Sequence, residues 1–204
     1  MIQRDGRNTA FGTLRLKRHH RLVFTACFLQ FCPIEPYNGG PASIVEPIAE
    51  HLPEYEFILA SYLGTGTQAA YRGTRLFDPA SPASKALVAK WVSWFKKYRA
   101  ILNSDIVHVR RPDLSGIDAM LHVNPNATQC DERGLLMIWN QTPEPQVTTL
   151  SVPLYYTGLT ATARVSVEGS DPPTEYQLAR DYSILLNVSM PAMSVTWMVV
   201  TGDT

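Results

Sequence analysis

The chain has 204 residues, enough for one domain or two small ones, and its 18 lysine and arginine residues balance 18 aspartate and glutamate residues. A net charge of zero argues against nucleic acid or an anionic membrane as the main partner, because both select basic surfaces. The 3 cysteines form no CxxC pair and have no histidine at ligand spacing, which argues against a zinc site or a disulfide framework. We therefore expect no metal and no cofactor.

The N-terminus is locally basic and is followed by an apolar segment. We expect residues 1–21 to be a basic, disordered arm, with a basic binding arm as the alternative. The apolar segment 22–32 is too short to span a membrane, and no small-residue cleavage site of a signal peptide follows it. We predict a buried strand here, bounded by Pro33.

Loops and helices alternate in the next part of the chain. The Pro, Asn and Gly residues of 32–41 indicate a loop, after which Ser43 is expected to cap a short helix. Pro53 is expected to separate this helix from a longer one over 54–63, which ends at Gly64. The segment 67–73 then predicts a short buried strand.

A second, longer helix is predicted over 84–102, starting at Ser84. Apolar residues recur along it at helical spacing, namely Leu87, Trp91, Phe95, Tyr98 and Leu102. Charged residues occupy the other side, namely Lys90, Lys96, Lys97 and Arg99. The region 22–103 thus has strand–helix–strand–helix order, which is typical of parallel α/β sheets and barrels. A complete barrel needs about 250 residues, so we predict an incomplete TIM-barrel remnant.

Seven or eight short strand-like segments separated by turns fill the remainder, 104–204. Val147, Thr149 and Ser151 alternate with Thr148, Leu150 and Val152, as expected for half-buried strands. This spacing favours an antiparallel β-sandwich. The predicted fold class is therefore α+β, with a partial βαβα segment followed by an antiparallel sandwich.

Several phrases together resemble one family in their order and spacing. They are TGTQAAYRGTRLFD (65–78), WVSWFKKYRAILNSDIVHVRRPD (91–113), IDAMLHVNP (117–125), GLLMIWNQT (134–142), VPLYYTGLTATARV (152–165) and SMPAMSVTWMVV (189–200). Residues 30–204 resemble the C-terminal region of large bacterial glycoside hydrolases with an architecture like that of the α-galactosidase clan. The resemblance implies the end of a catalytic barrel followed by a β-sandwich. It also implies a carbohydrate substrate, with the clan's catalytic carboxylates lying on strands upstream of this sequence.

The resemblance therefore implies a hydrolase fragment that is inactive alone, and we assign no catalytic residue. Glu35 and Tyr37 follow the first predicted strand, where barrel sites are built, and we expect them to contact substrate. Tyr71, Arg72 and Arg75 end the short strand and suit sugar recognition by ring stacking and hydrogen bonding. The alternative is structural: a loop at Glu35 that only shapes the turn, and an ion pair of Asp78 with Arg72 or Arg75.

Other polar and aromatic residues are expected to be structural. Glu46, Glu50 and Glu54 are four apart, as on a solvated helix face. His108 and Arg110 share one strand and His122 lies on another, and we favour hydrogen-bonded structural histidines over a metal site. Core or interdomain packing is likewise favoured over a sugar-binding platform for a set of aromatic residues, namely Trp139, Tyr155, Tyr156 and Trp197.

Two further hypotheses remain open. One is a non-catalytic β-sandwich binding or interaction module with a helical extension. The other is an independent small enzyme, which ranks last because no paired acid and base are visible. In a barrel remnant, uncovered edges such as that of the strand 22–31 would also favour self-association.

Overall fold

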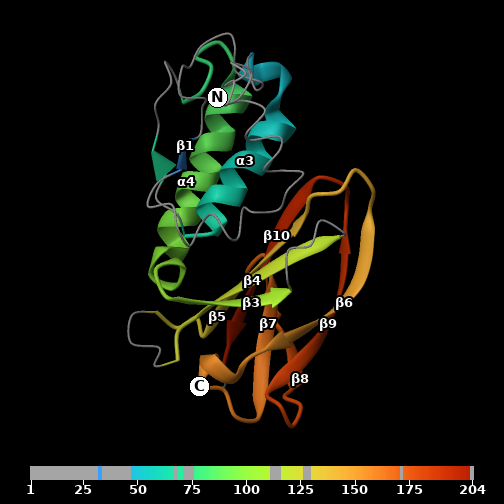
Figure 1. Ribbon diagram of the computed structural model, residues 1–204. Coiled ribbons are helices and arrows are strands. Elements are labelled where there is room, and N and C mark those ends of the chain that lie inside the picture. Colours follow the sequence, from blue (N-terminus) through green and yellow to red (C-terminus); the bar gives the residue numbers. More distant parts are fainter. Residues whose placement is uncertain are drawn as a thin grey trace, which may run out of the picture. The chain divides into compact units, whose positions relative to one another are not determined.

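The computed structural model describes residues 32–33, 47–66, 69–70, 76–110, 116–125, 130–170 and 172–202. Two long helices and mostly antiparallel strands form an α+β fold, which confirms the predicted class (Figure 1). The chain divides into two compact units, Met1–Lys96 and Lys97–Thr204. The predicted basic arm and the strand 22–31 lie outside the described residues. No helix in the described ranges is long and apolar enough to cross a membrane.

The first unit contains a parallel strand pair with helices between its strands. Strands β1 (Cys32–Pro33) and β2 (Ala69–Ala70) pair in parallel, with Cys32 opposite Ala69. A 3-10 helix, η2 (Ile48–Glu50), and the α-helix α3 (Leu52–Gly64) lie between them in the chain. This is the strand–helix–strand order that the sequence predicts, since parallel strands need a crossover connection.

Helix α3 is buried on nearly every side. It begins at Leu52 and ends at Gly64, and Pro53 lies in its first turn, where backbone N–H groups have no helical partner. The run 57–64 is buried without a break, which marks an internal helix rather than an amphipathic surface one. Glu54 is exposed at its start, as expected for a solvated carboxylate.

Helix α4 (Pro82–Leu102) begins two residues before the predicted start. The Ser84 N–H donates to Ser81 Oγ at 3.3 Å, so Ser81 caps the helix and Pro82 takes its first position. The Ser84 hydroxyl instead donates to the Ser81 carbonyl at 2.9 Å. The prediction of Ser84 as the start was therefore wrong, because Ser81 caps the helix and Ser84 lies inside its first turn.

The buried face of α4 is also rotated from the predicted one. Its most buried apolar residues are Val88, Trp91, Trp94, Tyr98, Ile101 and Leu102. Leu87 and Phe95 are only half-buried, which corrects two of the five predicted positions. The four predicted basic residues of the opposite side are exposed. Trp91 and Trp94 meet edge to face, with ring centroids 5.3 Å apart.

The described residues of the second unit form eight strands in two sheets. The strands are β3 (Asp105–Arg110), β4 (Ile117–Val123), β5 (Gly134–Asn140), β6 (Gln146–Pro153), β7 (Thr162–Val167), β8 (Thr174–Gln177), β9 (Ser183–Met190) and β10 (Ser194–Thr201). Six form an antiparallel sheet in the order β3–β4–β5–β10–β7–β8, and β6 pairs with β9. A 3-10 helix, η3 (Tyr155–Thr157), follows β6.

Both sheets contribute to one apolar core, so the unit is a β-sandwich as predicted. Leu121 of β4 and Leu136 of β5 belong to the same buried cluster as Val152 of β6 and Leu186 of β9. Along β6 the alternation is also confirmed, since Leu150 and Val152 are buried while Val147 and Thr149 are exposed.

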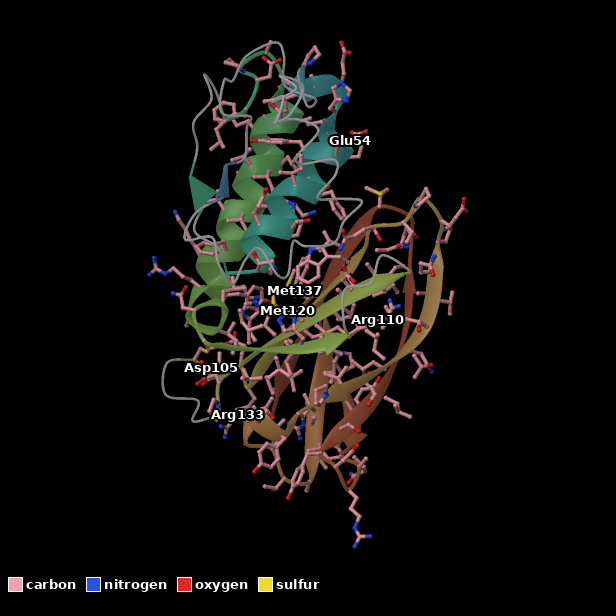
Figure 2. The ribbon with its side chains drawn as sticks, in the orientation of Figure 1. Glu54, Asp105, Arg110, Met120, Arg133 and Met137 are labelled. Carbon is pink, nitrogen blue, oxygen red and sulfur yellow. The ribbon has the colours of Figure 1, made fainter. Side chains whose placement is uncertain are left out.

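Strands β4 and β5 are buried on both faces. Met120 and Met137 lie opposite each other on the side away from this core, and both are fully buried (Figure 2). Burial on both sides explains why IDAMLHV and GLLMIWN are nearly continuous apolar runs rather than alternating ones.

Candidate functional site

The five predicted substrate contacts lie outside the described residues. Glu35 and Tyr37 follow β1 in the chain, and Tyr71, Arg72 and Arg75 follow β2. Because β1 and β2 are adjacent and parallel, the two groups follow neighbouring strands at the same end. Their contact with a sugar remains a proposal.

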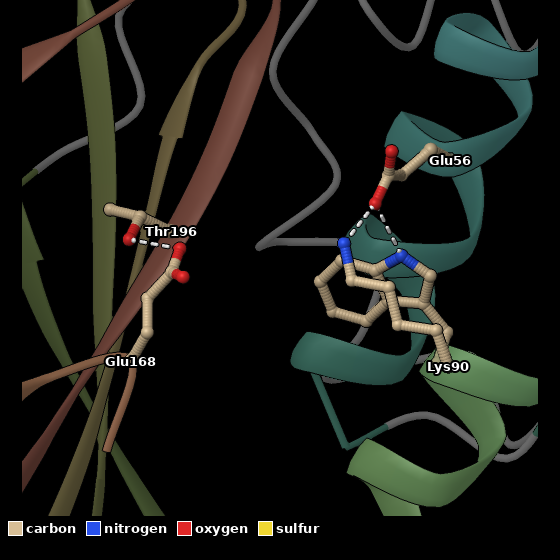
Figure 3. Close-up of polar contacts among 5 residues, drawn as sticks. Glu56, Lys90, Glu168 and Thr196 are labelled. Atoms are coloured by element: carbon tan, nitrogen blue, oxygen red, sulfur yellow. Dashed lines mark hydrogen bonds and ion pairs between the residues drawn. The ribbon is translucent and has the colours of Figure 1, made fainter. Parts of the chain in front are cut away.

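One carboxylate of the first unit has a structural role. Glu56 Oε1 accepts hydrogen bonds from Lys90 Nζ at 2.6 Å and from Trp91 Nε1 at 3.0 Å (Figure 3). These bonds join α3 to α4 and satisfy the indole N–H of a residue that is 2% exposed. Glu56 is thus a helix-to-helix anchor.

The two histidines of the sandwich differ in burial. His108 is exposed on β3, while His122 is fully buried on β4 and lies opposite Ile106. A bulge between His108 and Arg110 interrupts the alternation of side chains along β3. The Arg110 guanidinium donates to the Ile117 carbonyl. In the described part of the chain, no three His, Cys, Asp or Glu side chains gather as metal ligands would.

Cys130 is a half-buried thiol. Burial, followed by interactions with Glu132, raises its pKa above the usual value. Asn124 Nδ2 lies 3.3 Å from the sulfur and opposes this effect. The thiol is therefore protonated at neutral pH, which does not suit a nucleophile.

A groove of about 430 Å³ opens on the second unit along β9, β10 and the end of β7. We call it the β9–β10 groove. Its polar lining includes Glu168, Asn187 and Ser189, and Met190 and Met198 add apolar surface. The Glu168 carboxylate accepts a hydrogen bond from Thr196 Oγ1 at 3.1 Å (Figure 3).

Two backbone features shape this groove: a residue with a positive φ and a corner that a buried amide fixes. Glu168 has a φ of 55°, in the left-handed region that residues other than glycine rarely adopt. Asn140, fully buried, donates to the Pro191 carbonyl at 2.7 Å and so fixes the β9–β10 corner. Amide, hydroxyl and carboxylate groups can hydrogen-bond a polyhydroxylated ligand. Glu168 is the single carboxylate among the lining residues, whereas glycoside hydrolysis uses two.

The aromatic residues of the sandwich divide into buried and exposed sets. Trp139 is 1% exposed, which confirms packing for this ring, and Trp197 is half-buried. Tyr155 and Tyr156 are 61% and 60% exposed, so neither ring packs in the core of the sandwich. They lie in η3, a turn beyond the strand, which releases them from the alternation.

Sequence reasoning missed Tyr182, whose ring joins these exposed tyrosines at 5.4 Å from Tyr155. Tyr182 lies in the turn that separates β8 from β9. The adjacent Arg180 and Asp181 are the polar signal that could have located that turn.

Comparisons with known proteins support the fold. No family model matches the chain, and no curated protein matches it. Among solved structures, it is similar to an α-amylase from Geobacillus thermoleovorans complexed with acarbose, with a TM-score of 0.58 and 10% identity over 96% of this chain and 47% of that one. An Anoxybacillus α-amylase gives a TM-score of 0.58 and 10% identity, with 95% and 46% covered. The chain thus has a glycoside-hydrolase-like fold and spans about half the length of these enzymes.

Proposed function

We propose that this chain is the C-terminal portion of a carbohydrate-active glycoside hydrolase. The observation that carries the proposal is the shared fold, which covers 96% of this chain in the Geobacillus α-amylase. The resemblance of residues 30–204 to bacterial glycoside hydrolases points to the same class. In this proposal 22–103 supplies part of a barrel rim, and 104–204 is an accessory sandwich.

The parallel pairing of β1 and β2 supports the predicted sugar contacts. In α/β barrels the segments that follow the strands build the active site. Glu35 and Tyr37 follow one strand of this pair, and Tyr71 and Arg72 follow the other. Under the proposal, a tyrosine ring stacks on a pyranose while the guanidinium and carboxylate hydrogen-bond its hydroxyls.

We infer that the chain alone is inactive. Retaining and inverting enzymes both place two carboxyl groups across the scissile bond. Glu56 is engaged between two helices, and the β9–β10 groove offers one carboxylate, Glu168. Self-association is a further part of this proposal, since strand edges favour it.

The alternative is a non-catalytic β-sandwich binding or interaction module. The polar lining of the β9–β10 groove and the exposed Tyr155 and Tyr156 favour this alternative, because they give the sandwich ligand-binding surface of its own.

The test combines a panel of nitrophenyl glycosides with calorimetric titration of maltoheptaose and galactosyl-mannan oligosaccharides. We expect no turnover, and weak binding that falls in Tyr71→Ala and Arg72→Ala. Glu54→Gln, at an exposed position on α3, is the matched control for Glu35→Gln. Turnover that is lost in Glu35→Gln alone would overturn inactivity and indicate a compact enzyme. Binding unaffected by Tyr71→Ala and Arg72→Ala would contradict the rim contacts.

A further inference from the structure

Three tyrosines form an exposed cluster at one end of the sandwich. Tyr155 meets Tyr156 at 5.2 Å and Tyr182 at 5.4 Å between ring centroids, in both cases edge to face. The exposed fractions are 61%, 60% and 37% for Tyr155, Tyr156 and Tyr182. We call these three residues the tyrosine cluster.

Buried residues on both sides of Tyr155 and Tyr156 hold these two rings outward. Leu154 and Thr157 are fully buried, and Thr157 Oγ1 donates to the Leu154 carbonyl at 2.6 Å. Gly158 then takes a φ of 75°, and a side chain there would begin 2.9 Å from the Pro125 carbonyl. The turn therefore has fixed anchors at both ends, with Tyr155 and Tyr156 between them.

The third ring comes from the turn before β9, and that turn is hydrogen-bonded to η3. The Leu154 N–H donates to the Tyr182 carbonyl at 2.9 Å, and the Tyr182 N–H donates to the Ala179 carbonyl at 2.9 Å. Asp181 Oδ1 accepts from the Ser183 hydroxyl at 2.7 Å. These bonds fix the two turns relative to each other, so the cluster is preorganised.

Tyr182 also occupies a strained backbone position. Its φ of 62° lies in the left-handed region, where glycine would fit without a steric penalty. Strained residues that the surrounding structure holds in place concentrate at binding and catalytic sites. A tyrosine at this position places a ring beside Tyr155 that glycine could not supply.

We propose that the tyrosine cluster is a carbohydrate-binding surface on which the pyranose rings of a polysaccharide stack. In an edge-to-face pair the edge of one ring covers only one face of the other, so the cluster leaves other ring faces open to solvent, in line with the exposed fractions of these rings. Each phenol adds a hydroxyl that can bond a sugar hydroxyl, and rigid tyrosines lose little conformational entropy on binding. Arg180 and Asp181 in the neighbouring turn have opposite charges, which suits a neutral ligand. This inference deepens the proposed function by adding a contact surface apart from the barrel rim.

Native affinity electrophoresis of the full chain in gels containing soluble starch, galactomannan or xylan tests the proposal. We expect retardation in at least one gel. Tyr155→Ala and Tyr182→Gly should each weaken the affinity about threefold to tenfold, because an aromatic contact is worth about that much. Tyr182→Gly removes a ring while relieving its backbone strain, so a loss of binding there would not reflect unfolding. Tyr155→Trp should retain binding.

The matched control is Val147→Ala, which trims another exposed apolar residue, 80% exposed near the start of β6. Its retardation should equal that of the unchanged chain. Equal retardation of the tyrosine variants, or none of the unchanged chain in any gel, would overturn the proposal. A dimer in light scattering that Tyr155→Ala converts to monomer, without any change in retardation, would assign the cluster to self-contact instead.

The rim variants separate this proposal from the proposed function. Binding that depends on Tyr155 but not on Tyr71 would support the tyrosine cluster and contradict the rim contacts. Binding that depends on Tyr71 alone would do the reverse.

Discussion

Glu56 stabilises the fold more through the hydrogen bond that it accepts from a buried indole than through its ion pair. Its Oε1 receives both the exposed ammonium of Lys90 and the N–H of Trp91. The side chain of Lys90 is 57% exposed, so solvent screens the ion pair. The Trp91 N–H lies on a residue that is 2% exposed, so its lost bond would not be replaced easily by water.

We therefore predict unequal losses of stability from the two sides of this contact. Glu56→Ala should lower the free energy of unfolding by about 1–3 kcal/mol, because the buried indole loses this acceptor. Lys90→Ala should cost about 0–1 kcal/mol, as exposed ion pairs do. Urea denaturation followed by far-UV circular dichroism measures both. Equal losses would show that the ion pair, rather than the indole bond, dominates.

At the scale of the element, α4 shows what a sequence pattern can and cannot determine. The existence of the helix and its charged side were predicted, since eleven or more residues of consistent periodicity leave little ambiguity. Its start was not, because Ser81 and Ser84 both suit a cap and only the backbone geometry selects Ser81. The buried face was displaced because neighbouring apolar residues, Trp94 and Phe95, compete for one position. Packing, which is non-local, decides between them.

Trp91 is the central residue of that buried face and gives the element-scale prediction. Trp91→Ala should lower the free energy of unfolding by about 3–5 kcal/mol, because it removes a buried ring and leaves a cavity. Phe95→Ala removes a half-buried ring of the same helix and should cost clearly less. Thermal and urea unfolding by circular dichroism compare the two. A loss below about 1 kcal/mol for Trp91→Ala would contradict the burial of this face.

At the scale of the whole molecule, local patterns predicted the fold class but not the strand order. Alternation and turns located most strands of the sandwich, since both are short-range signals. The insertion of β10 between β5 and β7 depends on pairings between distant segments, which no local pattern specifies. The tyrosine cluster escaped prediction for the same reason, because Tyr155 and Tyr182 belong to separate turns joined by the Leu154–Tyr182 hydrogen bond. The predicted rim contacts rest on sequence position after β1 and β2.

The two-stranded sheet leads to a prediction about assembly. Within the described residues, β9 pairs with β6 alone, which leaves one of its edges without a strand neighbour. Its sequence, SILLNVSM, carries no charge, and Leu185 is 65% exposed. Lysine, proline and bulges are the features that usually protect an edge strand from pairing with another chain. Strand β9 contains neither lysine nor proline.

We therefore expect the purified chain to self-associate through β9 as its concentration rises. Leu185→Lys should shift the light-scattering mass towards the monomer, because two copies would bring like charges together at the paired edge. Val147→Lys adds the same charge at another exposed apolar position, on β6, and should leave the mass unchanged. If both variants dissociate the assembly equally, the outer face of the sheet rather than the edge of β9 makes the contact. A chain that stays monomeric at every concentration would refute self-association.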